Sequence, residues 1–297
     1  MRYPFTTVDV FTRHRFGGNP LAVVLDADTL DETQMQAIAR EFNYSETTFV
    51  LRPADERHTA RVRIFTPACE VPFAGHPNVG TAHVLAARAG LDARPERFVF
   101  EEKAGLVPVS IGWQGDTVGT VELTAPVSLS TGSRFDAGAV AASLSLDAGA
   151  IRTDRHPPLI ASVGLPFLVV EITSRSALAA AKIDFGAISK LLPTEGADAI
   201  YPYCRELRAD DGEVDFTARM FAPWDGVAED PATGSATGAA CSLIASLAPP
   251  HAPRRFRVAQ GVDMKRPSRL DIRTGEPDGL VRIGGTCVPV LSGFIEV

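Results

Sequence analysis

Two related segments carry the residues best suited to chemistry, a histidine and an aspartate that each stand directly before a proline. His76 opens the segment His-Pro-Asn-Val-Gly-Thr-Ala, and Asp230 opens Asp-Pro-Ala-Thr-Gly-Ser-Ala, which contains Ser235. Since proline is favoured in the first turn of a helix and the polar residue before it can cap the helix, we expect helices that begin at Pro77 and Pro231. The free N–H groups at a helix start attract anions, so each segment predicts a binding position for a carboxylate or another anion.

Glu46 is the third candidate for chemistry. It lies in Asn43-Tyr-Ser-Glu-Thr-Thr-Phe-Val50, where a predicted helix has just ended and a predicted strand begins. Such junctions often hold reactive groups on a rigid scaffold. The local sequence leaves two interpretations open. His76 and Asp230 could be helix caps alone, with Ser235 only a small helix residue and Glu46 a solvated surface carboxylate.

The elements that must position these residues repeat along the chain. Arg63-Ile-Phe-Thr-Pro67 is similar to Arg219-Met-Phe-Ala-Pro223, and Gly18–Val24 is similar to Gly164–Val170. Together with the two proline segments, they occur in the same order and at nearly one spacing, which indicates two homologous halves. A linker is predicted near Thr124–Ser133.

Hydrophobic patterning predicts an α+β fold. Alternating apolar and polar residues indicate many short strands, and one amphipathic helix is expected to end at Phe42 with a capping box of Thr29 and Glu32. The two proline-started helices, expected to end near Gly90 and Leu247, are rich in small residues. We therefore expect each to be buried and wrapped by the strands of its own half.

Composition excludes several classes of function. The formal net charge is −7 and no basic cluster stands out, so a nucleic-acid partner is not expected. No apolar run is long enough for a membrane span and the start lacks the apolar core of a signal peptide, so we expect a cytoplasmic protein without a membrane partner. His76 and His83 could share a helical face without a third ligand nearby, so no metal is expected. Nucleotide-binding glycine motifs and a Schiff-base lysine are absent from the sequence, so no cofactor is expected.

Five stretches of the chain resemble the PhzF family, the phenazine-biosynthesis isomerase group related in fold to diaminopimelate epimerase. They are Phe16–Val24, Tyr44–Phe49, Arg63–Pro67, Pro72–Pro77, and Phe221-Ala-Pro followed by Glu229–Ala236. The resemblance implies two pseudo-symmetric α+β domains, residues 1–124 and 125–297, each a mixed sheet rolled into a barrel around a central helix. The last strand, near 289–297, could return to the first domain. The active site would lie between the domains, and the protein would be a homodimer.

The resemblance also assigns roles to individual residues. The family's catalytic glutamate falls on Glu46, its active-site histidine on His76 and its aspartate on Asp230. The motif positions near the substrate are Asn19, Ser45, Gly75, Gly234 and Ser235.

The function expected from these assignments is a cofactor-independent isomerase that shifts a proton on a small carboxylate-bearing metabolite. Glu46 would act as base and then as acid, which requires a pKa raised by an apolar wall, and Phe42, Tyr44 and Phe73 are available for it. The epimerase relatives use two cysteines at the helix starts. Here Cys69 and Cys241 are interpreted as small buried residues, which disfavours a thiol mechanism.

Three alternatives remain at this stage. One is an amino- or hydroxy-acid epimerase or racemase, with Glu46 paired with His76 or Asp230. The second is a non-catalytic small-molecule binding protein of the same fold, and the third is an interaction protein. Family membership by itself does not place the chain in phenazine biosynthesis, because the substrate depends on side chains that the sequence does not position.

Overall fold

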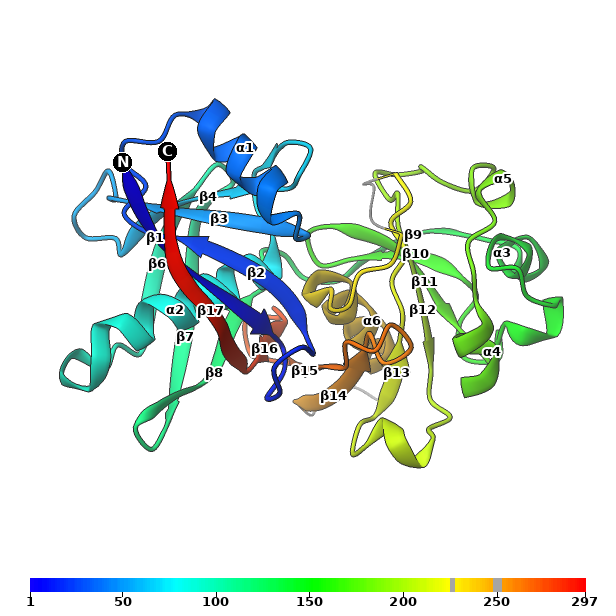
Figure 1. The fold of residues 1–297 in the computed structure, drawn as a ribbon. Helices are drawn as coiled ribbons and strands as arrows, with labels where there is room; N and C mark the ends of the chain where they lie inside the picture. Colours follow the sequence, from blue (N-terminus) through cyan, green and yellow to red (C-terminus); the bar gives the residue numbers. More distant parts are fainter. Residues whose placement is uncertain (225–227, 248–252) are drawn as a thin grey trace. The chain divides into compact units, whose positions relative to one another are not determined.

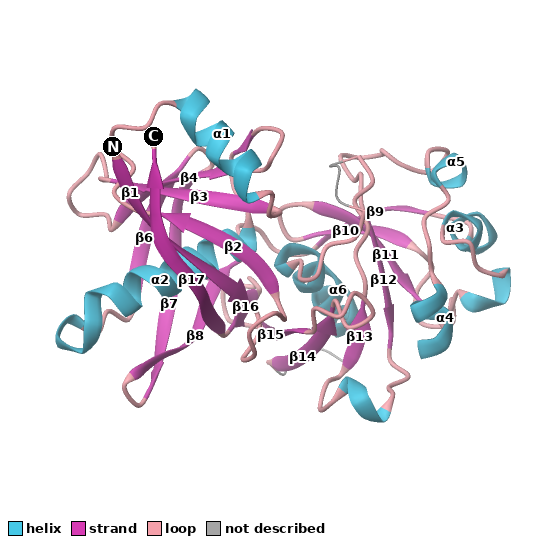
Figure 2. Cartoon of the chain, in the orientation of Figure 1, coloured by secondary structure: helices cyan, strands magenta, loops and turns pink. Residues whose placement is uncertain are grey.

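The computed structural model describes residues 1–224, 228–247 and 253–297, which fall into two compact units (Figure 1). The first unit contains Met1–Thr124 and Gly284–Val297, and the second contains Ala125–Ile283. Strands predominate over helices in both units, as Figure 2 shows. The α+β fold class predicted from the sequence is therefore confirmed.

The first unit consists of strands that surround one long helix. Its elements are β1 (Arg2–Val10), β2 (Asn19–Val24), α1 (Glu32–Phe42), β3 (Glu46–Leu51), β4 (Ala60–Phe65), β5 (Glu70–Val71), α2 (Gly75–Ala93), β6 (Arg97–Glu102), β7 (Gly105–Gln114), β8 (Thr117–Thr124) and β17 (Cys287–Glu296). Strand β16 (Arg282–Gly285) crosses the boundary between the units.

The sheet of the first unit mixes parallel and antiparallel pairs. Strand β1 lies between β2 and β17 and is antiparallel to both. Strand β2 is parallel to β3, β3 is antiparallel to β4, and β4 is parallel to β6. Strands β6, β7 and β8 form an antiparallel run. The last strand of the chain, red in Figure 1, thus pairs with the first, blue strand.

Helix α2 is enclosed by the strands of the first unit. It packs against β1, β2, β7 and β8, and its side chains from His76 to Val84 are buried. An added Cβ on Gly80 would lie 2.5 Å from Leu21 Cδ2 and 2.9 Å from Val10 Cγ2, so the strands approach the helix as closely as a glycine allows. The hydroxyls of Thr81 on the helix and Thr48 on β3 are hydrogen-bonded at 2.8 Å.

The second unit repeats this plan with a shorter helix. Its elements are β9 (Ser130–Arg134), α3 (Ala137–Ser143), β10 (Leu159–Ser162), β11 (Pro166–Glu171), α4 (Arg175–Ala180), α5 (Phe185–Ile188), β12 (Ile200–Cys204), β13 (Phe216–Ala218), α6 (Gly234–Ser246), β14 (Arg254–Gln260) and β15 (Ser268–Thr274), with short 3₁₀ turns at Ala148–Ala150 and Ala209–Asp211. The pairs β11–β12 and β13–β14 are parallel, and the pairs β9–β10, β10–β11, β12–β13 and β14–β15 are antiparallel.

Helix α6 occupies the place in the second unit that α2 has in the first. It packs against β10, β11, β14 and β15, and it is buried along nearly its whole length. A Cβ on Gly238 would lie 3.0 Å from Ile283 Cδ1. The hydroxyl of Thr237 is hydrogen-bonded to that of Tyr201 on β12 at 2.8 Å. The expectation of two buried helices rich in small residues is confirmed.

Some local predictions were wrong. The capping box of α1 is formed by Asp31 and Gln34, because the helix begins at Glu32 and a cap must stand directly before the first helical residue. The predicted linker Thr124–Ser133 contains part of β9, whose polar residues pair with β10 as a strand. The expected end of the first central helix near Gly90 was correct, because the helical backbone of α2 is interrupted at Gly90, where φ is 75°, and a further turn runs to Ala93.

Membrane insertion by a helix finds no support in the structure. Within residues 1–224, 228–247 and 253–297, every helix is too short or too polar to cross a lipid bilayer.

Replacement of Gly80 by alanine tests the close approach of helix and strands. Alanine favours helix by about 1 kcal/mol over glycine, but overpacking a core costs about 1–3 kcal/mol. We expect G80A to lower the free energy of unfolding in urea. The control is G149A, where a Cβ would meet none of the described heavy atoms within 4 Å and little change is expected. A G80A protein as stable as the wild type would show that the strands have room to move.

Candidate active site

Both central helices begin at other residues than the sequence predicted. Helix α2 begins at Gly75 with Ala74 as N-cap, so His76 lies inside its first turn. Helix α6 begins at Gly234 with Thr233 as N-cap, so Asp230 lies in the loop before it. The prediction that His76 and Asp230 cap helices starting at the following prolines is therefore wrong. Proline is compatible with any position of a first turn whose N–H is unbonded, so it does not fix the start.

His76 is held from the side of β2. Its Nδ1 lies 3.3 Å from Asn19 Nδ2, and Ser45 Oγ donates to Asn19 Oδ1 at 3.4 Å. In the tautomer in which Asn19 donates to Nδ1, the imidazole proton lies on Nε2. Burial lowers the pKa of His76 to about 3, although the backbone of Pro20 opposes the shift. The imidazole is therefore neutral at physiological pH.

Glu46 faces the other nitrogen of this imidazole. Its Oε2 lies 3.5 Å from His76 Nε2, and its side chain is 18% exposed. Glu46 is the first residue of β3 and pairs with Leu21 of β2. It comes directly after the turn that ends α1, where Asn43 adopts a left-handed conformation (φ 52°) that asparagine tolerates well. The sheet register thus brings Glu46 to the first turn of α2.

The apolar wall predicted around Glu46 consists of Phe42, Tyr44 and Phe73, and the structure shows a contact between the first two of these side chains. The rings of Phe42 and Tyr44 lie 6.0 Å apart, and Phe42 also contacts Phe5 at 5.2 Å. Phe42 packs against the core cluster beneath α1. A wall around the carboxyl made of Phe42, Tyr44 and Phe73 stays a prediction.

An arginine–glutamate pair fixes the segment that leads to His76. Arg63 on β4 donates to both oxygens of Glu70, with Nε–Oε1 at 2.7 Å and Nη2–Oε2 at 2.6 Å. Glu70 begins β5, which precedes α2. A fork of two parallel hydrogen bonds fixes orientation as well as distance, so β5 is held at a set angle on β4 and delivers His76 in a defined position.

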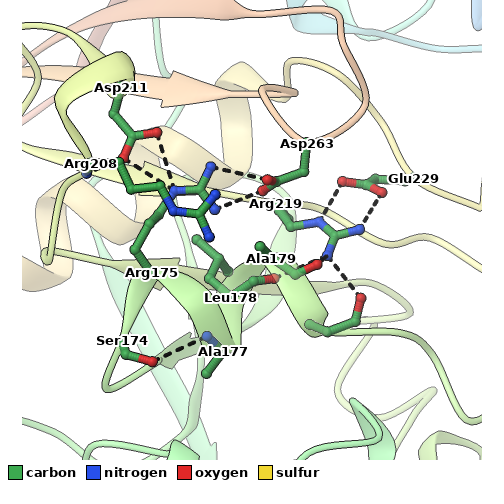
Figure 3. Close-up of polar contacts among 11 residues, drawn as sticks. Ser174, Arg175, Ala177, Leu178, Ala179, Arg208, Asp211, Arg219, Glu229 and Asp263 are labelled. Carbon is green, nitrogen blue, oxygen red and sulfur yellow. Dashed lines mark hydrogen bonds and ion pairs between the residues drawn. The ribbon is translucent and has the colours of Figure 1, made fainter.

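The second unit contains the same kind of pair (Figure 3). Arg219 donates through Nε and Nη2 to the two oxygens of Glu229, both at 2.7 Å. Its Nη1 donates to the backbone carbonyls of Leu178, Ala179 and Ala181. Glu229 directly precedes Asp230 in the chain. The repeated Arg-X-Phe-X-Pro motif therefore supplies an arginine that anchors the loop before each central helix.

Further hydrogen bonds hold Asp230 itself. Its backbone N–H donates to Met220 O at 3.0 Å, and its carbonyl accepts from Gln260 Nε2 at 2.8 Å. Gln260 Oε1 accepts from the backbone N–H of Thr233 at 3.1 Å, and the hydroxyl of Thr233 donates to the carboxylate of Asp230. The buried Gln260 thus locks the loop from Asp230 to the helix start.

A buried arginine supports the turn that packs against this loop (Figure 3). Arg175 of α4 forms ion pairs with Asp211 and Asp263. Asp263 belongs to the turn that begins at Gly261, where φ is +71° and an added Cβ would lie 2.7 Å from Pro231 O. Glycine is required there for both reasons, and the close approach confines the loop that contains Asp230.

The structure gathers the predicted site residues into one group in each unit. Asn19, Ser45, Glu46 and His76 are linked by the distances given above, and Gly75 opens α2, where an added Cβ would meet no described heavy atom within 4 Å. In the second unit, Asp230 lies in the loop before α6, and Gly234 and the half-buried Ser235 form the start of that helix. No cluster of three or more potential metal ligands occurs in the described parts of the chain.

Comparison with known proteins decides the family. A family model described as phenazine biosynthesis-like protein (PhzC-PhzF) matches residues 8–293. The chain is 39% identical to an uncharacterized isomerase of Mesorhizobium japonicum, over 97% of both chains. It is 35% identical to a trans-2,3-dihydro-3-hydroxyanthranilate isomerase of Pseudomonas aeruginosa, over 95% of both chains. The crystal structure of a Bacillus anthracis PhzF-family protein matches with a TM-score of 0.88 and 26% identity, over 100% of both chains.

The chain belongs to the phenazine biosynthesis-like family of isomerases. The PhzF resemblance and the epimerase-like fold predicted from the sequence are thereby confirmed.

One cysteine of this PhzF-family chain differs from the prediction. Cys69 is exposed, because it lies in the turn between β4 and β5, where Thr66 Oγ1 accepts from its backbone N–H. Cys241 is buried within α6 as predicted, and burial raises the pKa of its thiol.

Three glutamates near the predicted site residues were not identified from the sequence. The partners Glu70 and Glu229 follow their arginines at unequal spacings of seven and ten residues, so alignment of the two halves does not reveal them. Glu102, at the end of β6, has a pKa raised to about 8 by burial, and the side chain of Asn78 in α2 opposes that shift. The run of two glutamates at the end of a strand gives no local signal that one is buried.

Breaking the arginine–glutamate pair of the second unit tests its contribution. Arg219 and Glu229 are 10% and 15% exposed, and removal of one partner from such a pair leaves an uncompensated charge. We expect R219M and E229Q each to lower the free energy of unfolding by about 3–5 kcal/mol. The control is R52M, since Arg52 is 85% exposed and its pair with Asp28 is worth about 1 kcal/mol or less. Equal effects of R219M and R52M would refute the anchoring role.

The two buried histidines of α2 predict a pH dependence of stability. Burial lowers the pKa of His76 to about 3 and of His83 to about 4, against about 6.5 in an unfolded chain. Below pH 6.5 the unfolded state therefore binds protons that the folded state does not. Each histidine should reduce the free energy of unfolding by about 1.4 kcal/mol per pH unit as the pH falls toward its folded pKa.

Urea unfolding between pH 7 and 4.5 measures this effect. The free energy of unfolding of the wild type should fall as the pH falls. We expect H76N and H83N each to reduce the slope of that fall by the amount that corresponds to about one proton. G80A serves as the control, because it changes stability without removing a titrating group. An H83N protein with the wild-type slope would contradict a neutral buried His83.

Proposed function

We propose that this isomerase catalyses a cofactor-independent proton shift on a small carboxylate-bearing metabolite, with Glu46 as the group that removes and returns the proton. The observation that carries the proposal is the 3.5 Å approach of Glu46 Oε2 to Nε2 of the buried His76. Because His76 has a pKa of about 3, it does not take a proton from the Glu46 carboxyl near neutral pH. The imidazole is a neutral neighbour of the carboxyl, at 3.5 Å, and the transferred proton stays on Glu46.

The reaction proceeds in two proton transfers. The Glu46 carboxylate takes a proton from an acidic carbon beside an unsaturated or carbonyl group, and the C–H electron pair enters the conjugated system. The resulting carboxylic acid returns the proton to a different carbon on the same face, which shifts the double bond and regenerates the carboxylate. The substrate keeps its composition, as an isomerisation requires.

The other predicted site residues bind and polarise the substrate. We assign Asn19, Ser45 and Gly75 to contacts around the reacting carbons. Gly234 and Ser235 offer the backbone N–H groups and the hydroxyl of a helix start, which suit a carboxylate. Asp230, held by the neighbouring Glu229 and by Gln260, would orient a polar substituent of the substrate.

The comparisons support an isomerase and leave the substrate to experiment. The Pseudomonas aeruginosa relative is named for a dihydrohydroxyanthranilate, so that compound is the first probe, followed by other small unsaturated carboxylic acids. An epimerase would need a second base on the opposite face of the reacting carbon, which the stereochemistry of exchange reveals. The homodimer and the cytoplasmic location stay predictions.

Solvent isotope exchange tests the role of Glu46. In D₂O, exchange of the Glu46 carboxyl proton with solvent before its return should place deuterium at carbon on one face of the product. Substitution E46Q should reduce kcat by about 10²–10⁴-fold, the usual contribution of a positioned acid–base group, and should leave substrate binding largely intact. E41Q is the matched control, since Glu41 is exposed on the neighbouring helix α1 and should retain full activity.

Two results would overturn the proposal. An E46Q enzyme with wild-type turnover would remove Glu46 from the reaction. Deuterium delivered to the face opposite the abstracted proton would indicate two bases and favour the epimerase.

A further inference from the structure

The first unit contains a cavity that the proposed reaction does not use. It has a volume of about 510 Å³ and lies between the second half of α2, the β7–β8 hairpin and the start of β17. The predicted site residues do not line it; its wall includes His83, Trp113 and Val118. A volume of this size is within the usual range for small-molecule sites.

A buried histidine in the cavity wall has unused hydrogen-bonding capacity. His83 is 6% exposed, and within the described parts of the chain its Nδ1 has no hydrogen-bond partner. Burial lowers its pKa to about 4, so the ring is neutral and offers one donor and one acceptor. Buried polar groups in native proteins nearly always have partners. His83 also borders a second cavity of about 230 Å³, so its ring lies in the wall of both.

The cavity is also bordered by two exposed residues of opposite charge. Arg13 belongs to the loop between β1 and β2, and Asp116 belongs to the turn of the β7–β8 hairpin. Neither has an ion pair with any residue that the structure describes. Some other exposed charges of the same unit do pair, as Arg88 does with Asp26. A cation and an anion that border one cavity without pairing suit a ligand that carries both charges.

The rest of the cavity lining is mainly apolar. Leu91, Trp113 and Pro289 line the cavity. The indole N–H of Trp113 is already used, because it donates to Pro95 O at 2.9 Å. The ring therefore contributes only apolar contact to the cavity, which suits an aliphatic or aromatic side chain.

We propose that this cavity binds a zwitterionic α-amino acid with an apolar side chain. Its carboxylate pairs with Arg13, its ammonium pairs with Asp116, and its side chain packs against Trp113 and Leu91. His83 supplies a hydrogen bond from the wall. The site is separate from the group around Glu46, so occupancy does not depend on the isomerase reaction.

Calorimetric titration of the full chain with L-phenylalanine tests this proposal. Binding should be measurable at millimolar concentration or below. Three analogues each lack one feature: 3-phenylpropionate has no ammonium group, phenethylamine has no carboxylate, and glycine has no apolar side chain. Each should bind at least about tenfold more weakly than L-phenylalanine, since each forfeits one charged or apolar contact.

Surface variants locate the bound amino acid. R13Q and D116N should each weaken binding of L-phenylalanine by about tenfold or more. R52Q and D26N are the matched controls, because they also remove one exposed charge from the first unit but do not line the cavity. The E46Q variant should bind L-phenylalanine as the wild type does, which separates this site from the proposed catalytic one.

Several results would overturn the proposal that the cavity binds an amino acid. Absence of binding at tens of millimolar, equal affinity for 3-phenylpropionate, or full affinity in both R13Q and D116N would each overturn the proposal. Loss of binding in E46Q with retention in R13Q would place the amino acid at the catalytic group instead. These charged residues are exposed, so the variants are expected to fold, and circular dichroism verifies that they do.

Discussion

The close approach of strands to a central helix is the constraint on which each unit depends. In the first unit, the side chains of Leu21 and Val10 occupy the space where Gly80 would carry a Cβ. A helix packed this tightly cannot shift along its axis without a clash, because protein interiors are as dense as organic crystals. The first turn of α2 is therefore fixed, and with it the ring of His76. The reactive geometry follows from packing at a distance from the reactive atoms.

The two arginine–glutamate pairs extend this constraint to the loops before the helices. Packing fixes the helix, but the segment that enters it needs its own restraint. The fork of Arg63 on Glu70 provides one in the first unit, and that of Arg219 on Glu229 provides one in the second. Repetition of the same device, despite different loop lengths, indicates that the position of the helix entrance has been kept in both halves.

Several features of the fold could be read from the sequence, because they depend on patterns that are local or repeated. The small residues of the two proline segments predicted buried helices, and the repeated motifs predicted two halves of one plan. The exact helix starts could not be read, since a proline fits any early position of the first turn. Asp31 was missed as the cap of α1 because the nearby Thr29 also fits a capping pattern.

The residues of the candidate site could be predicted where they belong to sequence motifs. Glu46, His76 and Asp230 stood in recognisable segments. Glu70 acts through a contact between strands, and the buried Glu102 is influenced by Asn78 of α2, neither of which any spacing reveals. Burial was also hard to read, as the exposed Cys69 shows. The cavity beside His83 is formed by four separate segments of the chain, so its existence depends on the fold.

The pairing of β1 with β17 has a consequence for how the protein is made. Synthesis begins with the amino terminus, and domains tend to fold as they emerge. Yet β17 leaves the ribosome after every strand of the second unit, and until then β1 has one edge without a partner. An unpaired strand edge is a template for aggregation. The nascent first unit must wait, incomplete, while the whole second unit is translated, and this interval is when the chain most needs protection by chaperones.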